Sequence, residues 1–370
     1  MRSEGGVRLT PEQEDLRAAV RGLLDRYPVA PEADDSAERG LWRRLCAEIG
    51  VAGLAIPERF GGAGAGPVEV HVVMEELGRS LTPAPLLGSA VLATQALLAS
   101  GDEAACQRLL PALAEGSQTA ALAWTTAAGR WDPNEVACQA AATTTGTDGW
   151  AVTGEAHFVL DGDVASVLLV PALMPDGETC LFEINPAQLR VMRTRSTSVD
   201  QSRRLSVVRL SGAAGVRIGA RVDLEPARTA GCIALSAEQV GAAAAALALT
   251  VAYAKVRVQF GRPIGSFQAL QHRMAEMHVL VGSARSLSYA AAEAAHSGAA
   301  DTALRAATAK AYCSEVLGQV TSEMIQLHGA IGMTWEHAAH RYFKRGHGAA
   351  FLLGAPAGHI DRVAAAVVGS

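Results

Sequence analysis

The residues best suited to chemistry gather in one segment, residues 253–268. A helical pattern ends there at Arg257 and is followed by Phe260 and a turn at Pro263. Arginine can bind an anion through paired hydrogen bonds, an aromatic ring offers a flat apolar surface, and Gln268 adds a donor and an acceptor. The segment could therefore hold a flat, anionic ligand. The alternative is an ordinary helix end with a basic last turn, which the spacing alone favours.

Two other clusters do not meet the requirements of nucleotide or metal binding. The glycine run at 61–66 lacks the spacing of a dinucleotide fingerprint, and no predicted strand precedes it. His337 and His340 follow Glu336 in the order Glu-His-x-x-His, whereas a metalloprotease needs His-Glu-x-x-His. We interpret the glycines as a loop and the histidines as packing or surface residues, and we predict no metal site.

Composition narrows the class of protein. The chain has 370 residues, of which 49% are hydrophobic and 19% charged, so it can bury a substantial core. Its formal net charge is -5 and it contains no long basic run, which disfavours nucleic-acid binding.

The expected location is the cytoplasm. The six cysteines are widely scattered with no Cys-x-x-Cys pair, a usage that suits a reducing compartment. Residues 1–13 hold no apolar segment of the kind a secretory signal needs. The uncharged stretch 239–254 is shorter than the roughly 20 apolar residues of a membrane span, so we interpret it as a buried helix.

The pattern of the chain changes twice. Residues 1–118 are predicted to be helical, beginning with Pro11 after a Thr10 cap and with Gln13 completing a capping box. Residues 119–226 show short β-type runs and turn pairs such as Ser211-Gly212, and predict a small antiparallel sheet. Residues 227–370 predict long helices packed as a bundle, one of them capped by Asp301. The predicted helices are 11–24, 41–49, 69–78, 89–100, 103–113, 233–258, 270–296 and 302–327, and the predicted strands are 150–153, 157–160, 167–170, 180–184 and 205–210.

Three stretches are similar to signatures of the acyl-CoA dehydrogenase family. Residues 257–268 match its Arg-x-Gln-Phe-Gly-x-Pro-Ile-x-x-Phe-Gln pattern. Residues 54–62, followed by Glu-Glu-Leu-Gly-Arg at 75–79, resemble its N-terminal Pro-Glu and Gly-Gly turn, and residues 326–333 resemble its Gln-x-x-Gly-Gly-x-Gly segment. The continuation at 335–337 resembles an actinobacterial branch used in steroid and related catabolism.

The resemblance implies an α+β fold with an N-terminal helical domain (1–118), a middle antiparallel β domain (119–226) and a C-terminal four-helix bundle (227–370). It implies an FAD-dependent oxidoreductase, tetrameric, that oxidises an acyl-CoA between Cα and Cβ and passes electrons to an electron-transfer flavoprotein. In that chemistry a carboxylate removes the α-proton while hydride leaves the β-carbon for the flavin.

The resemblance also indicates that the usual catalytic base is missing. The family places its base at one of two positions, which in this chain are Gly231 and Leu353, and neither side chain can accept a proton. Cys232 replaces an arginine of many relatives, and residues 337–360 contain no Asp or Glu. Glu238 is the only acid on the predicted helix 233–258, two turns or roughly 10 Å beyond Gly231, and is the candidate for an unorthodox base.

The flavin contacts that the resemblance implies divide unevenly. On the sheet side Thr125 and the aromatic Phe158 are kept, but Leu160 replaces a hydroxyl residue. The matching residues of the helical bundle, which in the family grip the ADP half of a neighbouring subunit's flavin, are Arg257, Phe260, Gln326, Gly329 and Gly332. Gln268 is a further expected cofactor contact.

This division predicts a helper subunit that completes a flavin site with a related, base-bearing chain in a heterotetramer. A self-sufficient homotetramer that uses Glu238 is the first alternative, and a scaffold that binds neither flavin nor acyl-CoA is the second.

Overall fold

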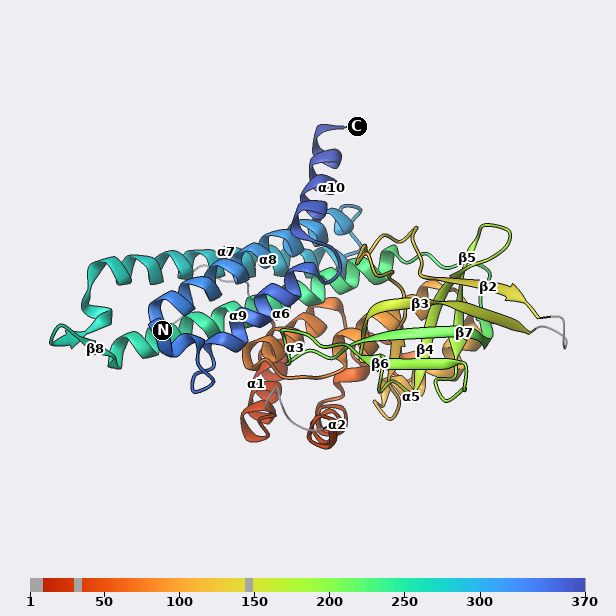
Figure 1. Ribbon diagram of the computed structural model, residues 1–370, viewed down its shortest axis with the longest axis horizontal. Coiled ribbons are helices and arrows are strands. Elements are labelled where there is room, and N and C mark those ends of the chain that lie inside the picture. Colours follow the sequence, from red (N-terminus) through yellow and green to blue (C-terminus); the bar gives the residue numbers. More distant parts are fainter. Residues whose placement is uncertain (1–8, 30–34, 144–148, 370) are drawn as a thin grey trace.

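The computed structural model describes residues 9–29, 35–143 and 149–369 (Figure 1). Residues 1–8, part of the segment in which no secretory signal was expected, lie outside these ranges. The chain folds in the predicted order of helices, sheet and helices, and Figure 1 shows the sheet at one end of the long helices of the C-terminal bundle. The α+β class is therefore confirmed.

The first helix begins where its cap residues predict. Thr10 caps α1 (Pro11–Arg26), and its hydroxyl accepts a hydrogen bond from the backbone N–H of Gln13, which completes the capping box. The predicted helix 41–49 starts earlier and ends in a wider π-type turn. The elements of this part are α2 (Asp35–Arg44), η1 (Leu45–Ile49), η2 (Val51–Gly53), η3 (Glu58–Phe60), α3 (Pro67–Ser80), η4 (Leu86–Ala93), α4 (Thr94–Ala99) and α5 (Glu103–Ala114).

The middle of the chain forms a closed sheet. Strand β4 pairs with β2, and the path continues through β3, β7 and β5 back to β4, which leaves few open edges. Most pairings are antiparallel as expected, but β1 and β2 both run parallel to β4, which was not predicted. The strands are β1 (Ala120–Leu122), β2 (Cys138–Ala142), β3 (Trp150–Leu160), β4 (Val167–Leu173), β5 (Thr179–Ile184), β6 (Val191–Arg195) and β7 (Leu205–Ile218).

Two predictions about this sheet were wrong. The runs 150–153 and 157–160 belong to one strand, β3, which bends at irregular pairings with β7 instead of turning. Ser211-Gly212 was predicted as a turn, but β7 continues through it. Gly212 adopts a φ of 71° beside a shift of register, so the glycine allows a bulge within the strand.

A single long helix organises the C-terminal part. Helix α6 (Glu225–Val256) packs against α3, η4, α7 and α8. It is long and apolar enough to cross a membrane, as is the bent pair of α9 and α10, but most of the apolar stretch of α6 is buried inside the protein. The other elements are β8 (Val258–Gln259), β9 (Arg262–Pro263), η5 (Ile264–Ser266), α7 (Gln268–His296), α8 (Thr302–His328), η6 (Gly329–Met333), α9 (Ala339–Phe351) and α10 (Pro356–Val368). Asp301 does not cap α8, because its carboxylate pairs with Arg305 instead.

Helices α3 and α6 touch backbone to backbone through two glycines. A Cβ built on Gly78 would lie 2.0 Å from the carbonyl oxygen of Glu238, and one built on Gly241 would lie 1.9 Å from that of Glu75. Such distances leave no room for a methyl group. The glycine of the Glu-Glu-Leu-Gly-Arg stretch therefore has a packing role, since it lets the N-terminal domain sit directly on α6.

Replacing Gly241 with alanine should destabilise the protein, because the methyl group must push α3 away from α6. We expect Gly241→Ala to lower the free energy of unfolding by about 3 kcal/mol in chemical denaturation. Gly22→Ala is the control, since Gly22 lies inside α1 with nothing within 4 Å of its built Cβ. That change should raise stability by about 0.5–1 kcal/mol. Equal effects of the two substitutions would contradict the close contact.

Candidate functional site

The two positions expected to carry a base meet in space. Gly231 lies in the first third of α6, and Leu353 follows α9. A Cβ built on Gly231 would lie 2.8 Å from Cδ1 of Leu353 and 2.6 Å from Cδ2 of Leu92, and both leucines are buried. The structure thus brings the two positions together and fills the space between them with hydrocarbon, where no proton acceptor is present.

The backbone around Leu353 is held firmly in place. Leu353 adopts a φ of 61°, which is uncommon for a bulky side chain. The Nε2 of buried His359 donates to the Leu353 carbonyl oxygen at 3.0 Å, since a carbonyl can only accept. Burial lowers the pKa of His359 to about 4, so this imidazole is neutral at pH 7.

A fully buried lysine holds the same loop from the other side. The Lys310 ammonium on α8 donates to Ser314 Oγ at 2.8 Å, to the Ala350 carbonyl at 3.1 Å and to the Gly354 carbonyl at 3.3 Å. The structure shows no carboxylate bonded to it in the ranges it describes. Burial lowers the pKa of Lys310 to about 8, because the charged form loses its hydration.

An apolar cavity of about 500 Å³ lies beside this region. Ala230, Ile233 and Ala234 of α6 contribute to its wall, together with Ala90 and Val91 of η4. Four alanines at or beside the turn between α7 and α8 add to the wall, and Asp223 and Glu225 give it an acidic edge; the alanines are Ala295, Ala299, Ala300 and Ala303. Small side chains leave room for a broad apolar group next to Gly231.

Glu238 does not lie with Gly231 and Leu353. Its buried carboxylate forms ion pairs with Arg203, from the sheet domain, and with Arg345 of α9 at 2.6 Å. Burial alone would raise the pKa of Glu238, but the charges of Arg203 and Arg345 outweigh it and lower that pKa. This arrangement favours a structural ion pair over proton abstraction.

Helix α6 carries a second acid that the predicted helix did not include. The helix begins eight residues earlier than expected, at Glu225. The Glu225 carboxylate pairs with Arg228 and, at 2.9 Å, with Arg362 of α10. Both acids on α6 are therefore neutralised by arginines.

Thr125 and Phe158 lie close together at one end of the sheet. The backbone N–H of His157 donates to the Thr125 carbonyl at 2.8 Å, and the Phe158 ring lies 3.4 Å from a Cβ built on Gly129. The Thr125 hydroxyl donates to the Arg130 carbonyl at 2.5 Å, so it already holds its own loop. Leu160 is buried and presents hydrocarbon where a hydroxyl was expected.

The bundle residues form a separate groove. Arg257, Phe260, Gln326 and Gly329 line a groove of about 480 Å³ at the end of α6. Phe260 is 91% exposed and Arg257 is exposed beside it, as a site for a flat, anionic group requires.

Two of the predicted bundle residues lie beside this groove and not in its wall. Gln268 is the exposed first residue of α7. Gly332 is buried in η6, and its built Cβ lies 3.1 Å from Cβ of His328, so it supports the turn that carries Gly329.

The two half-sites lie at opposite ends of the molecule. From Gly231 to Arg257 is 26 residues of α6, or about 39 Å at 1.5 Å per residue. Figure 1 shows β8 at the far end of the long helices from the sheet. Within one chain, the contact at Gly231 and the groove at Arg257 are therefore separated by most of the length of α6.

Known proteins match the chain along its length. Residues 10–117 match the model for the N-terminal domain of acyl-CoA dehydrogenases, and residues 224–368 match the model for their C-terminal domain. The chain is 39% identical over 366 residues to acyl-CoA dehydrogenase IpdE2 of Mycolicibacterium smegmatis, covering 97% of this chain and 100% of that protein.

Solved structures give the same fold. The ChsE4–ChsE5 complex from Mycobacterium tuberculosis contains a chain with a TM-score of 0.86 and 28% identity, covering 98% of this chain and 99% of that one. A chain of the Tcur3481–Tcur3483 steroid ACAD has a TM-score of 0.85 and 29% identity, covering 96% and 98%. Butyryl-CoA dehydrogenase from Megasphaera elsdenii shares the fold with a TM-score of 0.88 at 22% identity, covering 98% and 99%.

Replacing Lys310 with methionine should change how stability depends on pH. An unfolded lysine keeps its proton up to about pH 10.5, whereas Lys310 loses it near pH 8. Between these values the unfolded state binds more protons, so this group makes the free energy of unfolding rise with pH, by about 3 kcal/mol in total.

Denaturation curves from pH 7 to 11 measure this contribution. The free energy of unfolding of the wild type minus that of Lys310→Met should rise with pH across this range. Lys255 is exposed, so the same difference for Lys255→Met should not change with pH. A flat difference for Lys310→Met as well would contradict the buried charge.

Proposed function

Because the chain belongs to the acyl-CoA dehydrogenase family, whose members are FAD-dependent oxidoreductases, we propose that it is the helper subunit of a heteromeric acyl-CoA dehydrogenase. In this role it contributes one half of a flavin site, and a related chain supplies the base and the other half. The bound flavin supplies the hydride acceptor for oxidation of the acyl-CoA.

The observation that carries the proposal is the contact between Gly231, Leu353 and Leu92. Removal of an α-proton needs a group that accepts it within hydrogen-bond reach. Here a Cβ built on Gly231 would lie 2.8 Å from Cδ1 of Leu353, and neither position presents a group that can accept a proton. Neighbouring carboxylates such as Glu238 are already paired with arginines. The chemistry therefore has to take place on another chain.

The groove at the end of α6 supports the second part of the proposal. Arg257 offers a fixed donor pair for a phosphate oxygen, and Phe260 offers a flat face beside it. The residues present thus fit the diphosphate and ring of a flavin nucleotide. On the sheet side only Phe158 fits well, because Leu160 has no polar atom and the Thr125 hydroxyl is already bonded. The groove is therefore the better preserved half.

The names of two similar solved structures support a heteromeric assembly and a steroid-derived substrate. The ChsE4–ChsE5 structure is named a complex, and the Tcur3481–Tcur3483 structure pairs two names and is called a steroid ACAD. We propose that this chain likewise assembles with a different chain, as a heterotetramer, and acts on a bulky, steroid-derived acyl-CoA. We place this enzyme in the cytoplasm, with an electron-transfer flavoprotein as its electron acceptor. The alanine-lined cavity beside Gly231 has the width for a broad apolar group.

The first alternative is a self-sufficient homotetramer with Glu238 as base. It requires Glu238 to leave both arginines and reach a substrate two turns along α6. The second alternative, a scaffold without flavin, leaves the exposed Arg257 and Phe260 unexplained.

Replacing Arg257 with alanine tests the flavin half-site. The lone wild-type chain should purify with little flavin, and co-expression with its related subunit should give a yellow complex with fewer flavins than chains. In that complex Arg257→Ala should weaken flavin retention about 10- to 100-fold, because a charged hydrogen bond is lost. Arg262→Ala is the control, since Arg262 stacks on Phe267 of the same chain. Full flavin content and turnover of the lone chain would refute the helper role.

Replacing Glu238 with glutamine separates the helper from the self-sufficient enzyme. If a partner carries the base, turnover per folded complex should persist, although loss of a buried charge pair should cost about 3–5 kcal/mol of stability. If Glu238 is the base, turnover should fall by about 10²–10⁴. Asp200→Asn is the matched control, because Asp200 is equally buried and pairs with Arg345 at 2.9 Å without being a candidate base.

A further inference from the structure

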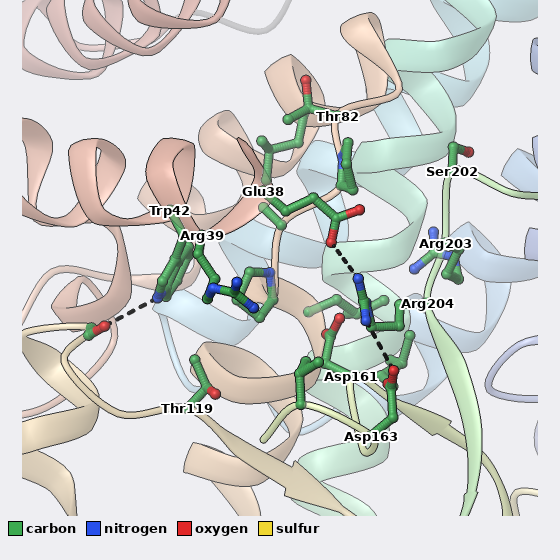
Figure 2. A pocket seen from close by; sticks show the side chains of 18 of the residues that line it. Glu38, Arg39, Trp42, Thr82, Thr119, Asp161, Asp163, Ser202, Arg203 and Arg204 are labelled. Carbon is green, nitrogen blue, oxygen red and sulfur yellow. Dashed lines mark hydrogen bonds and ion pairs between the residues drawn. The ribbon is translucent and has the colours of Figure 1, made fainter. Parts of the chain in front are cut away.

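A second large cavity, of about 530 Å³, lies between the N-terminal helices and the sheet domain (Figure 2). Its apolar wall is formed by Trp42 of α2, Met74 and Leu77 of α3, and Leu87 of η4. Its volume is within the range of small-molecule sites in proteins. Neither Gly231 nor Leu353 lines it, so this cavity is separate from the positions of the expected base, although Leu160 of the sheet side is part of its wall.

Most charged groups in this wall are already paired. Arg204 donates to Glu38 and Asp163, both at 2.9 Å, as the dashed lines in Figure 2 show. Glu238 accepts from Arg203 and Arg345. Each of these groups has an oppositely charged partner, although Asp163 Oδ1 and Arg203 Nε are buried without a hydrogen bond.

Asp161 is the exception. Within the part of the chain that the structure describes, its carboxylate forms no hydrogen bond or ion pair, and Figure 2 draws it in the cavity without a dashed line. Its Oδ2 lies 3.0 Å from a Cβ built on Gly88, so η4 closes one side of it. Burial raises the pKa of Asp161 to about 7, although Arg204 and Arg203 lower it in part. An unpaired, partly desolvated carboxylate lining a cavity is an open hydrogen-bonding position.

The surrounding charges restrict what can bind there. The guanidinium groups of Arg203 and Arg204 act on Asp161 and would repel an ammonium group. An anion placed beside Asp161 would be repelled by that carboxylate and by Asp163. A neutral group that donates a hydrogen bond remains.

We propose that this cavity binds a neutral alicyclic alcohol, with its hydroxyl donating to Asp161 and its ring carbons against Trp42, Leu77 and Leu87. The neighbouring hydroxyls of Thr82 and Thr119 give a second polar group of the ligand a partner. The proposal goes beyond the helper role and does not depend on it, because every residue of the cavity belongs to one chain.

Titration of the purified full-length chain with two matched probes tests this site. The probes are trans-decahydro-2-naphthol and trans-2-decalone, which share their ring carbons, while only the alcohol can donate a hydrogen bond. At pH 8.5, above the pKa of about 7, Asp161 is ionised and can only accept. Calorimetry should therefore show the alcohol binding about tenfold more tightly than the ketone.

Three variants make the test specific. Asp161→Asn should reduce the preference for the alcohol about fivefold, and asparagine tolerates the φ of 55° at this position. Ala84→Phe should fill the cavity and abolish binding of both probes, while Asp176→Asn, in an exposed turn of the same domain, should change neither. No saturable binding to wild type, equal affinity for alcohol and ketone, or an unchanged preference in Asp161→Asn would overturn the proposal.

Discussion

The length of α6 is the constraint on which the rest of the structure depends. Its 32 residues extend for about 48 Å, with Gly231 near one end and Arg257 just past the other. The helix is buried against α3, α7 and α8, so it cannot bend to shorten that distance. Each chain can therefore offer a sheet-side surface to one ligand and a groove to a different one. A flavin site built from these parts has to combine chains, and a chain that has lost one half-site can still complete its neighbour's.

The loop that carries Leu353 is held by contacts to its backbone. Leu353 adopts a left-handed conformation that is unfavourable for leucine by about 1–2 kcal/mol, yet His359 and Lys310 hold its loop through backbone carbonyls. These hydrogen bonds do not depend on which side chain stands at position 353. Under the proposed helper role, these backbone contacts allow the side chain at position 353 to change while the same hydrogen bonds hold the loop.

The sequence predicted what local signals specify. The capping box at Thr10, the long helices and the order of domains follow from side-chain periodicity and caps over a few residues. Strands β1 and β2 were missed because they are rich in alanine, which has little preference for strands, and their pairing with β4 is set by the whole sheet. Gly231 and Leu353 were both selected by resemblance, but their contact joins residues 122 positions apart and no local pattern encodes it. The cavity at Asp161 was missed for the same reason, since its wall comes from eight separate parts of the chain.

The adjacent arginines at 203 and 204 explain why Glu238 and Asp161, both on the wall of one cavity, differ. Arg204 turns towards α2 and binds Glu38, and Arg203 turns towards α6 and binds Glu238. Together with Arg345 they join the sheet to both helical parts, and each carboxylate they hold is lost to other chemistry. Asp161 precedes Asp163 by two residues, but Asp163 takes the remaining guanidinium nitrogen of Arg204. Because Arg204 is held by Glu38 and Asp163, and Arg203 by Glu238, neither arginine pairs with Asp161. Asp161 is therefore the carboxylate in the described wall that has no partner on either oxygen.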